Sequence, residues 1–312
     1  MSATQRDLTP ILIAGPTASG KSAIAMAIAV ATDGTIINAD SMQVYRELRV
    51  LTARPTSEDE ARVPHALYGF VPASEAYSAG RFVRDAAAAI AKSLSEGRRP
   101  IIVGGTGLYF KALLEGLSPI PEVRADIREH WRAVAERRGA SALHEDLARL
   151  DPIMATRLQP SDAQRIVRAL EVLQSTGRSL AEWQMMRGKP VLEEPKTKRL
   201  VVGLDRAELH ARADRRFESM IKSGAIEEVR ALVDMQLDSG FPAMRAIGVT
   251  PISAVLAGES TLEQAVSSGQ AETRQYIKRQ ETWLKRHMIS WKCINAQYLE
   301  NNMRDIFAFI RG

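Results

Sequence analysis

The sequence predicts an α/β fold in which a parallel sheet is flanked by helices and interrupted by an all-helical insertion domain. Three observations lead to this prediction. Short apolar segments alternate with helical segments in the first third of the chain, a glycine-rich loop joins the first such pair, and a long strand-free helical stretch follows. The 312 residues suffice for one large domain or two smaller ones with a sizeable core.

The glycine-rich loop at 15–22 reads GPTASGKS and fits the pattern G-x-x-x-x-G-K-[ST]. It lies between a strand-type apolar segment, Pro10–Ala14, and an Ala-rich helical segment, Ser22–Ala31. Gly15 and Gly20 allow close backbone approaches, and the amides form an anion nest at a helix start. Lys21 can meet a terminal phosphate, and the Ser22 hydroxyl can ligate Mg²⁺. We therefore predict a P-loop NTPase-like core, and the loop alone leaves the identity of the phosphate open.

The next predicted strands are Gly34–Ala39 and Ile101–Val103. Between them lies a predicted helix, Phe82–Glu96, which is ended by Gly97. The second of these strands runs into the loop 104–107, which reads GGTG. Because parallel strands present their carboxyl ends at one edge of the sheet, we expect the loops after all three strands to meet at a ligand-binding edge.

The stretch from Pro119 to Lys198 lacks a strand signal and is bracketed by prolines at both ends. Three helical segments fill it, at 122–139, 141–150 and 162–177. We predict that residues 119–198 form the insertion domain, and that 1–118 and 199–312 form the core. Arg199–Leu204 resumes the sheet, and the remainder is predicted to be helical, including 208–220, 225–235 and 271–288.

Composition limits the compartment and the kinds of site. No apolar segment approaches the roughly 20 residues of a membrane span, and the N-terminus lacks the layout of a secretory signal. Cys293 is the only cysteine, and the five histidines are scattered, so a disulfide framework and a cysteine or histidine metal cluster are excluded. We expect a cytoplasmic protein without membrane contact, and a monomer.

Basic and aromatic residues are interleaved between Gln270 and Lys292. The net charge of the whole chain is only +5, but this stretch holds six bases against Glu272 and Glu281. The bases are Arg274, Lys278, Arg279, Lys285, Arg286 and Lys292, and the aromatics are Tyr276, Trp283 and Trp291. Such a pattern suits a nucleic-acid surface, where cations meet phosphates and rings meet unstacked bases. The alternative is a solvated helix whose aromatic residues face the core.

Two aspartates follow predicted strands and are the candidate carboxylates near the loop. A nucleotide hydrolase or kinase needs a Mg²⁺-holding Asp at the end of a neighbouring strand, yet Ile101–Val103 ends in Gly-Gly-Thr. Asp205 has the right local setting but comes late in the chain. Asp40 follows the second strand and is an acid/base candidate, with a helix cap or turn residue as the alternative.

Several blocks of the sequence, in order, resemble the bacterial tRNA dimethylallyltransferases, the isopentenyl-tRNA transferase family. The blocks read GPTASGKS, NADSMQVYREL, TARPT, VPHAL, YSAGRFVRDA, VGGTGLYFKALLEGL, DAQRIVRALEV, RRFESMIKSGAIEEVRAL and AETRQYIKRQETWL. The resemblance covers nearly the whole chain. It implies that the P-loop holds the diphosphate of dimethylallyl diphosphate, with Mg²⁺ as cofactor. The implied acceptor is N6 of adenosine 37 in the anticodon stem-loop of tRNAs reading codons that begin with U, and the product is N6-isopentenyladenosine.

The resemblance also implies site residues. Asp40 is the expected general base, with Thr106 beside the channel and Arg216 as a second cation on the diphosphate. Diphosphate contacts are expected from Gly15, Thr17, Ala18, Ser19, Gly20, Lys21 and Ser22, the last also as the metal ligand. tRNA contacts are expected from Asp40, Ser41, Met42, Gln43, Thr106, Arg124, Gln164, Arg165, Ile166, Val167, Arg168, Arg245, Gly248, Lys278, Arg279, Gln280, Trp283 and Lys285. The insertion domain is thereby expected to contact tRNA.

Two positions depart from the family pattern. The family usually has Gly-Tyr-Arg or Gly-Tyr-Lys where this chain has Gly248-Val249-Thr250. Leu51 stands where a glycine usually precedes Thr-Ala-x-Pro. We expect the first departure to remove one aromatic and one basic tRNA contact, and the second to change the local loop shape.

Three other functions remain open on the sequence. An adenylate isopentenyltransferase would act on free AMP or ADP, but such a substrate needs neither the insertion nor the basic stretch. A P-loop small-molecule kinase would turn over ATP. An RNA-binding module with a relict phosphate loop would bind tRNA and leave it chemically unchanged.

Overall fold

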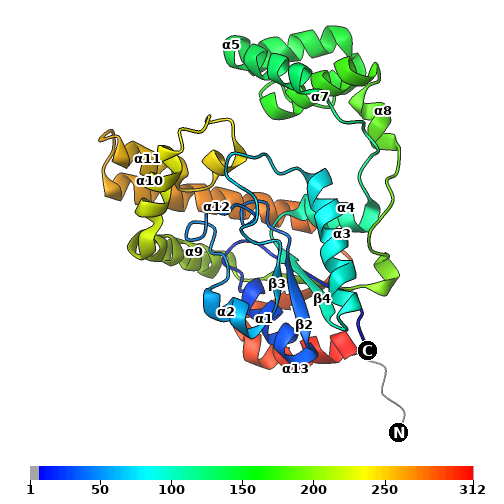
Figure 1. Ribbon diagram of the computed structural model, residues 1–312, viewed down its shortest axis with the longest axis vertical. Coiled ribbons are helices and arrows are strands. Elements are labelled where there is room, and N and C mark those ends of the chain that lie inside the picture. Colours follow the sequence, from blue (N-terminus) through cyan, green and yellow to red (C-terminus); the bar gives the residue numbers. More distant parts are fainter. Residues whose placement is uncertain (1–6, 312) are drawn as a thin grey trace. The chain divides into compact units, whose positions relative to one another are not determined.

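The structure is a computed structural model that describes residues 7–311, the side chains of 298–302 and 311 excepted. Within that range, six parallel strands form one sheet in the order β3-β2-β4-β1-β5-β6. Figure 1 labels three of them, β2, β3 and β4. The predicted α/β class and parallel sheet are confirmed. The strands are β1 (Ile11–Ala14), β2 (Gly34–Asn38), β3 (His65–Ala66), β4 (Arg99–Gly104), β5 (Lys198–Gly203) and β6 (Lys292–Asn295).

Alternate residues of each central strand enter two core layers. Leu12 packs on the side covered by α3 (Ala79–Ser95) and α4 (Gly107–Glu115). Ile11 and Ile13 pack on the side covered by α1 (Lys21–Thr32) and α13 (Leu299–Arg311). A strand buried on both faces needs apolar residues at every position, which is why β1 and β4 appear in the sequence as continuous apolar runs.

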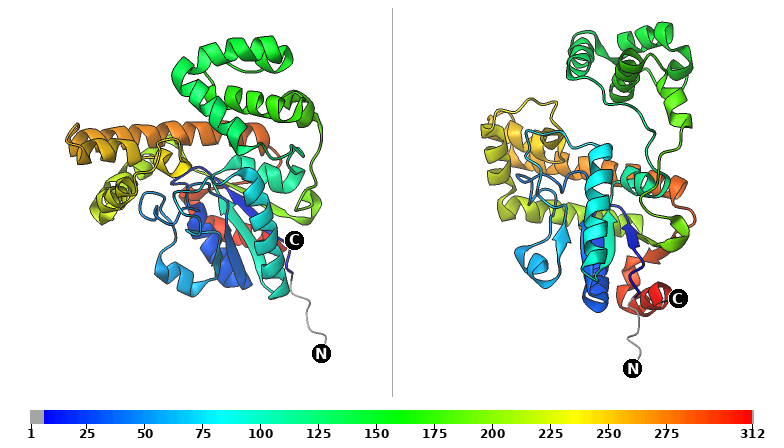
Figure 2. Two further views of the ribbon diagram at one scale, coloured as in Figure 1. Left: turned by 45° about the horizontal axis from the view of Figure 1, so that its top comes forward. Right: turned by 45° about the vertical axis from the view of Figure 1, so that its right-hand side comes forward.

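The helices after β5 continue the same compact unit. In Figure 2 the long helix α12, drawn in orange, crosses above the sheet. Thr261 and Gln264 form a capping box at its start, nine residues before the predicted start at Ala271. The elements are α9 (Arg206–Met220), the π-helical turn η2 (Ile221–Ala225), α10 (Ile226–Asp234), the 3₁₀ turn η3 (Pro242–Arg245), α11 (Val249–Leu256) and α12 (Leu262–His287). Before them come the short helix α2 (Ser57–Arg62) and the 3₁₀ turn η1 (Glu194–Lys196), and η4 (Ala296–Tyr298) precedes α13.

Residues 115–190 form a second compact unit made of helices. Asp162 and Gly177 cap α7 at both ends, as the sequence of that segment predicts. The two predicted segments 122–139 and 141–150 join as one element that is interrupted at Gly139, where φ is 76°. The helices are α5 (Ala125–Leu150), α6 (Pro152–Ala155), α7 (Ala163–Thr176) and α8 (Leu180–Met185).

Two sequence predictions need correction. The insertion is shifted, because 191–198 belong to the sheet-containing unit, where the amides of Val191 and Leu192 both donate to the Leu113 carbonyl at 2.9 and 3.0 Å. The last part of the chain is not wholly helical, because β6 adds an edge strand of four residues, three of them exposed. Among the described residues, none of the helices is long and apolar enough to span a membrane.

Candidate active site

The phosphate loop has the conformation that its sequence predicts. Gly20, at φ 84°, caps the start of α1, and Ala18 also takes a left-handed conformation at φ 63°. A side chain at Gly15 could not be accommodated, since its Cβ would lie 2.6 Å from the Val202 carbonyl oxygen. The loop therefore lies directly against β5, with its amides at the amino end of α1, where an anion binds most favourably.

Two cations lie at this loop. The Arg216 guanidinium, from α9, donates a hydrogen bond to the Thr17 hydroxyl, and the Lys21 ammonium donates to the Pro16 carbonyl at 3.2 Å. Burial lowers the pKa of Lys21 to about 8, with Arg216 acting in the same direction and Asp40 opposing it. Burial also lowers the pKa of Arg216, again opposed by Asp40. Two partly buried cations, to which no described carboxylate is bonded, favour a bound anion.

Asp40 is held at the carboxyl end of β2. The Asn38 side chain accepts from the Asp40 amide at 2.8 Å and donates to the Asp40 carbonyl at 2.9 Å. One carboxylate oxygen of Asp40 accepts from the Met42 amide at 2.9 Å. Asp40 therefore stabilises a turn, which was the alternative role predicted for it. No described residue donates to the other carboxylate oxygen. The side chain is thus oriented by a turn and keeps one oxygen for a substrate proton.

Thr106 is fixed beside Asp40 by a close backbone approach. A Cβ on Gly104 would lie 2.0 Å from the Ala39 carbonyl oxygen, so only glycine lets β4 end so near β2. The Thr106 amide then donates to that carbonyl at 3.2 Å, and its hydroxyl accepts from the Ser41 amide at 3.0 Å. The Thr106 hydroxyl also donates to the Ser41 hydroxyl at 3.3 Å.

A cavity of about 220 Å³ joins Asp40 to the phosphate-loop residue Thr17 and to Arg216, whereas Lys21 and Thr106 are not part of its lining. Polar residues, among them Arg245 and Arg279, and apolar residues, among them Phe217 and Met220, share its walls. Burial raises the pKa of the Tyr276 phenol, as does the nearby Asp40 carboxylate, so the hydroxyl stays protonated at neutral pH. Besides Thr17, Asp40 and Arg216, the lining residues are Ser41, Met42, Leu51, Thr52, Ala213, Phe217, Met220, Arg245, Ala246, Ile247, Thr273, Tyr276 and Arg279. A larger hollow, of about 1110 Å³, is lined by other residues, among them Lys196, Lys198 and Lys292, and includes none of the predicted site residues.

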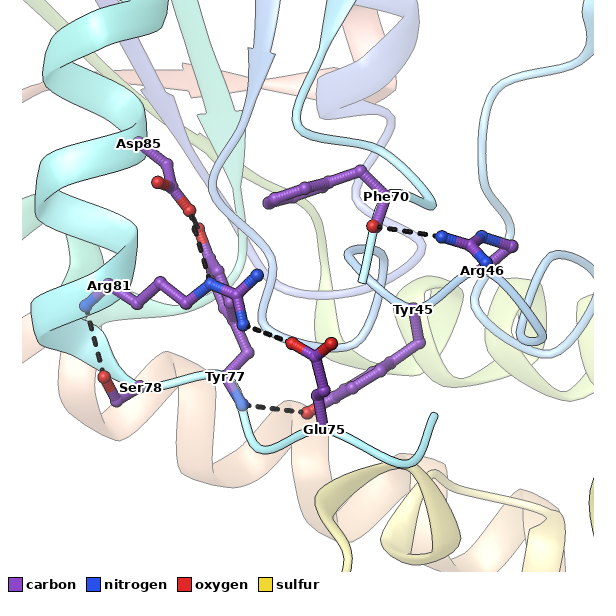
Figure 3. Close-up of polar contacts among 8 residues, drawn as sticks. All are labelled: Tyr45, Arg46, Phe70, Glu75, Tyr77, Ser78, Arg81 and Asp85. Atoms are coloured by element: carbon purple, nitrogen blue, oxygen red, sulfur yellow. Dashed lines mark hydrogen bonds and ion pairs between the residues drawn. The ribbon is translucent and has the colours of Figure 1, made fainter. Parts of the chain in front are cut away.

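The loop that carries Asp40 is anchored from two directions. The Glu228 carboxylate, on α10, accepts from the amides of Arg49, Val50 and Leu51 at 2.6, 2.7 and 2.9 Å. On the other side, the Tyr77 amide lies 3.4 Å from the Tyr45 hydroxyl, and the Tyr77 hydroxyl donates to Asp85 on α3 (Figure 3). The Gln43 side chain, a predicted tRNA contact, donates to the Thr52 and Ala53 carbonyls within this loop.

Helix α12 divides the predicted RNA-contacting residues into exposed and buried ones. Lys278, Arg279 and Lys285 are exposed, as RNA contacts require. Gln280 is buried, and its amide bridges Thr17 and Gly105. Trp283 is half-buried against Gly107.

The aromatic residues of the basic stretch 270–292 do not share one role. Tyr276 lines the cavity, whereas Trp291 belongs to the core. Trp291 is buried against Phe110 at a ring-centroid distance of 5.6 Å, so the interpretation of this residue as part of an RNA surface is wrong.

The predicted contacts in the insertion are a mixture as well. Arg124 and Arg165 have exposed side chains, each paired with an aspartate close in sequence, and Gln164 is exposed. Arg168 is half-buried beside Glu171. Ile166 is fully buried in the lobe and Val167 packs against the same cluster, so their side chains serve that core. Any RNA contact at Ile166 would have to come from its backbone.

The departures at 248–250 and 51 also find an explanation. Gly248 is buried against Leu51 and Phe217, and Val249 is 1% exposed, so position 249 belongs to the core of this chain. The expectation that Val249 stands at an RNA-facing position is therefore wrong, whereas Thr250 is exposed. Leu51 lines the cavity and so alters its wall. Arg245 lines the same cavity.

The carboxylates that the structure describes do not form a metal cage. Among the described residues, no group of three or more His, Cys, Asp or Glu side chains is placed to hold an ion. Asp205 caps α9 by accepting from the amides of Ala207 and Glu208, so it is a cap residue. Ser22 is exposed in the first turn of α1, and Mg²⁺ bound there would take further oxygens from phosphate and water, as this ion usually does.

Sequence reasoning missed the role of Gln280 and several cavity residues, among them Thr273 and Phe217. Each faces the site from α9 or α12, far from the phosphate loop in sequence. Only the spacing of Thr273, Tyr276 and Gln280 on one side of α12 could have indicated a shared face.

Comparisons with known proteins match almost all of this chain. The sequence profile of the family described as IPP transferase matches residues 43–287, and that of isopentenyl transferase matches 9–64. A protein of Parvibaculum lavamentivorans named tRNA dimethylallyltransferase is 50% identical over 300 residues, covering 96% of this chain and 95% of that protein. A protein of the same name from Nitrobacter hamburgensis is 51% identical over 290 residues, covering 93% and 92%.

Solved structures agree with the sequence comparisons. The full-length tRNA isopentenylpyrophosphate transferase of Bacillus halodurans superposes with a TM-score of 0.69 at 29% identity, covering 97% of each chain. A eukaryotic dimethylallyltransferase described as acting on tRNA gives a TM-score of 0.79 at 28% identity, covering 94% of this chain and 75% of that one.

Proposed function

Because the chain belongs to the IPP transferase family, we propose that it is an enzyme that prenylates tRNA. It transfers the dimethylallyl group from dimethylallyl diphosphate to N6 of adenosine 37, in tRNAs reading codons that begin with U. The supporting observation is that one cavity is lined by a carboxylate, Asp40, and by the phosphate-loop residue Thr17 with its Arg216 partner. A base and an anion site in one small cavity are what this transfer needs.

The reaction exchanges two bonds. The bond between C1 of the dimethylallyl group and the diphosphate oxygen breaks, and a bond between C1 and N6 of adenine forms. Asp40 accepts a hydrogen bond from N6 and takes its proton, while the diphosphate leaves with the electron pair of the broken bond. Lys21, Arg216 and the loop amides stabilise the charge that develops on the leaving diphosphate.

A metal ion fits this arrangement. We propose that Ser22 holds Mg²⁺ together with diphosphate oxygens and water, since the hydroxyl is exposed next to the loop amides. When bound, the ion adds further neutralisation of the diphosphate charge.

The adenine has to leave its stack to reach Asp40. We propose that the anticodon loop is splayed against Lys278, Arg279 and Lys285 of α12 and against the exposed arginines of the insertion. Thr106, Ser41 and Met42 surround the flipped base near Asp40. The apolar part of the cavity wall, formed by residues such as Phe217 and Met220, shields the prenyl group from water. The enzyme is proposed to work as a cytoplasmic monomer.

The test is to incubate the protein with dimethylallyl diphosphate, Mg²⁺ and unmodified tRNA, and to analyse the nucleosides by mass. We expect N6-isopentenyladenosine from adenosine 37 alone. Transfer to free AMP or ADP with unmodified tRNA would indicate an adenylate isopentenyltransferase, and ATP turnover with no prenylated product would indicate a kinase. Binding of tRNA without product would indicate an RNA-binding module.

A further inference from the structure

We propose that Gln280 is a positioning residue that holds the phosphate loop in its anion-binding conformation and ties it to α12. The inference rests on the proposed function, because it assigns the loop to a diphosphate. It departs from the family-based expectation that Gln280 contacts tRNA.

Both polar atoms of the Gln280 side chain are hydrogen-bonded to backbone groups inside the protein. Its Oε1 accepts from the Thr17 amide at 2.9 Å, and its Nε2 donates to the Gly105 carbonyl at 3.0 Å. The residue is 6% exposed. One side chain thus connects the loop after β1 with the loop after β4, and its removal would leave a loop amide and a carbonyl unpaired.

Thr17 is the point where this connection matters. The next residue, Ala18, holds a left-handed conformation that a non-glycine residue rarely adopts. Such a conformation persists only when its surroundings determine it. Thr17 is held by Gln280 at its amide and by Arg216 at its hydroxyl, so the loop is fixed immediately before the strained residue.

Helix α12 links this bridge to the RNA side of the site. Arg279 is exposed next to Gln280 and lines the cavity, and Tyr276 lies one turn earlier. The bridge therefore ties the phosphate loop to the helix that carries the expected RNA contacts.

The first experiment measures binding of inorganic diphosphate to the full-length protein by calorimetry, without tRNA or turnover. The variant is Gln280→Met, which keeps the size of the side chain and removes its amide. The matched control is Gln275→Met, an exposed glutamine on the same helix. We expect diphosphate to bind at least about tenfold more weakly to Gln280→Met and normally to the control. In steady-state assays the KM for dimethylallyl diphosphate should rise more than kcat falls.

A second variant approaches the same bridge from the other loop. A Cβ on Gly105 would lie 2.2 Å from Nε2 of Gln280, so Gly105→Ala should displace the amide. We expect it to weaken diphosphate binding, and the double variant to be little worse than either single one. If Gln280→Met does not fold, Gly105→Ala alone carries the test.

Two outcomes would overturn the inference. One is a normal diphosphate affinity in both variants. The other is a loss of tRNA affinity in Gln280→Met with diphosphate binding intact, which would make Gln280 an RNA contact. A wild-type protein that binds diphosphate but prenylates no tRNA would instead count against the proposed function.

Discussion

The cations of the phosphate-loop site and those of the helical insertion differ in what neutralises them. Arg124 and Arg165 of the insertion are exposed and paired with aspartates two and three residues away. Lys21 and Arg216 are hydrogen-bonded only to uncharged oxygens, and no described carboxylate forms an ion pair with them. Exposed pairs contribute little and exchange partners readily, whereas a poorly solvated cation without a counterion gains much from a bound anion. The first set suits reversible contact with RNA, and the second suits a tightly held diphosphate.

The largest effect is expected from a change at Asp40, the carboxylate that lies near Lys21 and Arg216. Asp40→Asn keeps shape and hydrogen-bonding capacity but removes the base, so turnover should fall by roughly 10²–10⁴-fold. Binding of tRNA should change little. Single-turnover prenylation and a filter-binding assay measure the two quantities. Near-normal turnover in this variant would remove Asp40 from the role of base.

Removal of the partly buried Lys21 ammonium should have the next largest effect. Lys21→Met removes the positive charge that stabilises the leaving diphosphate. We therefore expect turnover to fall about 10²–10³-fold, with tRNA affinity unchanged. Wild-type affinity for diphosphate should also decline above pH 8, because the protonated ammonium that favours the anion is lost as pH rises through its pKa of about 8. Calorimetry from pH 7 to pH 9 measures this decline, and a flat profile would contradict it.

The same group makes a prediction about stability without ligand. The folded-state pKa of Lys21 lies below its ordinary value of 10.5, so the unfolded chain binds more protons between pH 8 and 10.5. Lys21→Met should therefore be more stable than the wild type at pH 7, and the difference in free energy of unfolding should shrink as pH rises toward 10.5. Urea titrations at several pH values check the trend. A variant less stable than the wild type at pH 7 would show that the ammonium contributes packing that outweighs its desolvation.

Removing one exposed charge from the insertion should have a smaller effect, and the effect should be on tRNA affinity and not on turnover. Arg165→Gln should weaken tRNA binding and reduce the slope of log affinity against log salt by about 0.7, as for one phosphate contact to a single strand. The rate at saturating tRNA should stay the same. Arg178→Gln is a suitable control, since Arg178 also pairs locally, with Glu182, but was not predicted to contact RNA. Equal effects of both variants would mean that the response is a general charge effect.

The smallest expected effect concerns the exposed position of the 248–250 segment. Thr250→Lys should add one RNA contact and steepen the salt slope by up to about 0.7, with roughly a few-fold gain in affinity. Val249→Tyr should instead disturb the core, because Val249 is buried, and lower the melting temperature without a gain in affinity. Improved tRNA affinity in the Tyr variant would show that the position reaches the surface after all.

The sequence predicted the parts of the fold whose signals are local. Continuous apolar runs marked β1, β2, β4 and β5, and Asp162 and Gly177 marked the ends of α7. Two strands were missed, β3 and β6. Both are short and lie at the edges of the sheet, so neither carries an apolar run or an alternation long enough to indicate a strand. The first nine residues of α12 lack apolar periodicity, although the capping box at Thr261 and Gln264 was a usable signal.

The site divides in the same way. Lys21 and Asp40 follow strands and could be placed from the sequence, because a loop motif and the end of a strand fix them. Tyr276 and Gln280 could be placed on one helix, but not against a loop more than two hundred residues away in sequence. Nor could the sequence show that Trp291 packs inside while Arg279 faces the cavity. Those distinctions depend on how α12 and the segment between α12 and β6 pack against the rest of the unit.

The shared carbonyl of Leu113 has a consequence for the evolution and engineering of the chain. Because the amides of Val191 and Leu192 both bond to that carbonyl, the chain leaves the sheet-containing unit and returns to it at one point. The two ends of the insertion are thus held together by bonds within the sheet-containing unit. The number of residues between them can therefore vary at little cost in chain entropy. A few glycines in place of 115–190 should leave the remainder able to fold, and helical lobes of other sizes could be accepted at the same junction.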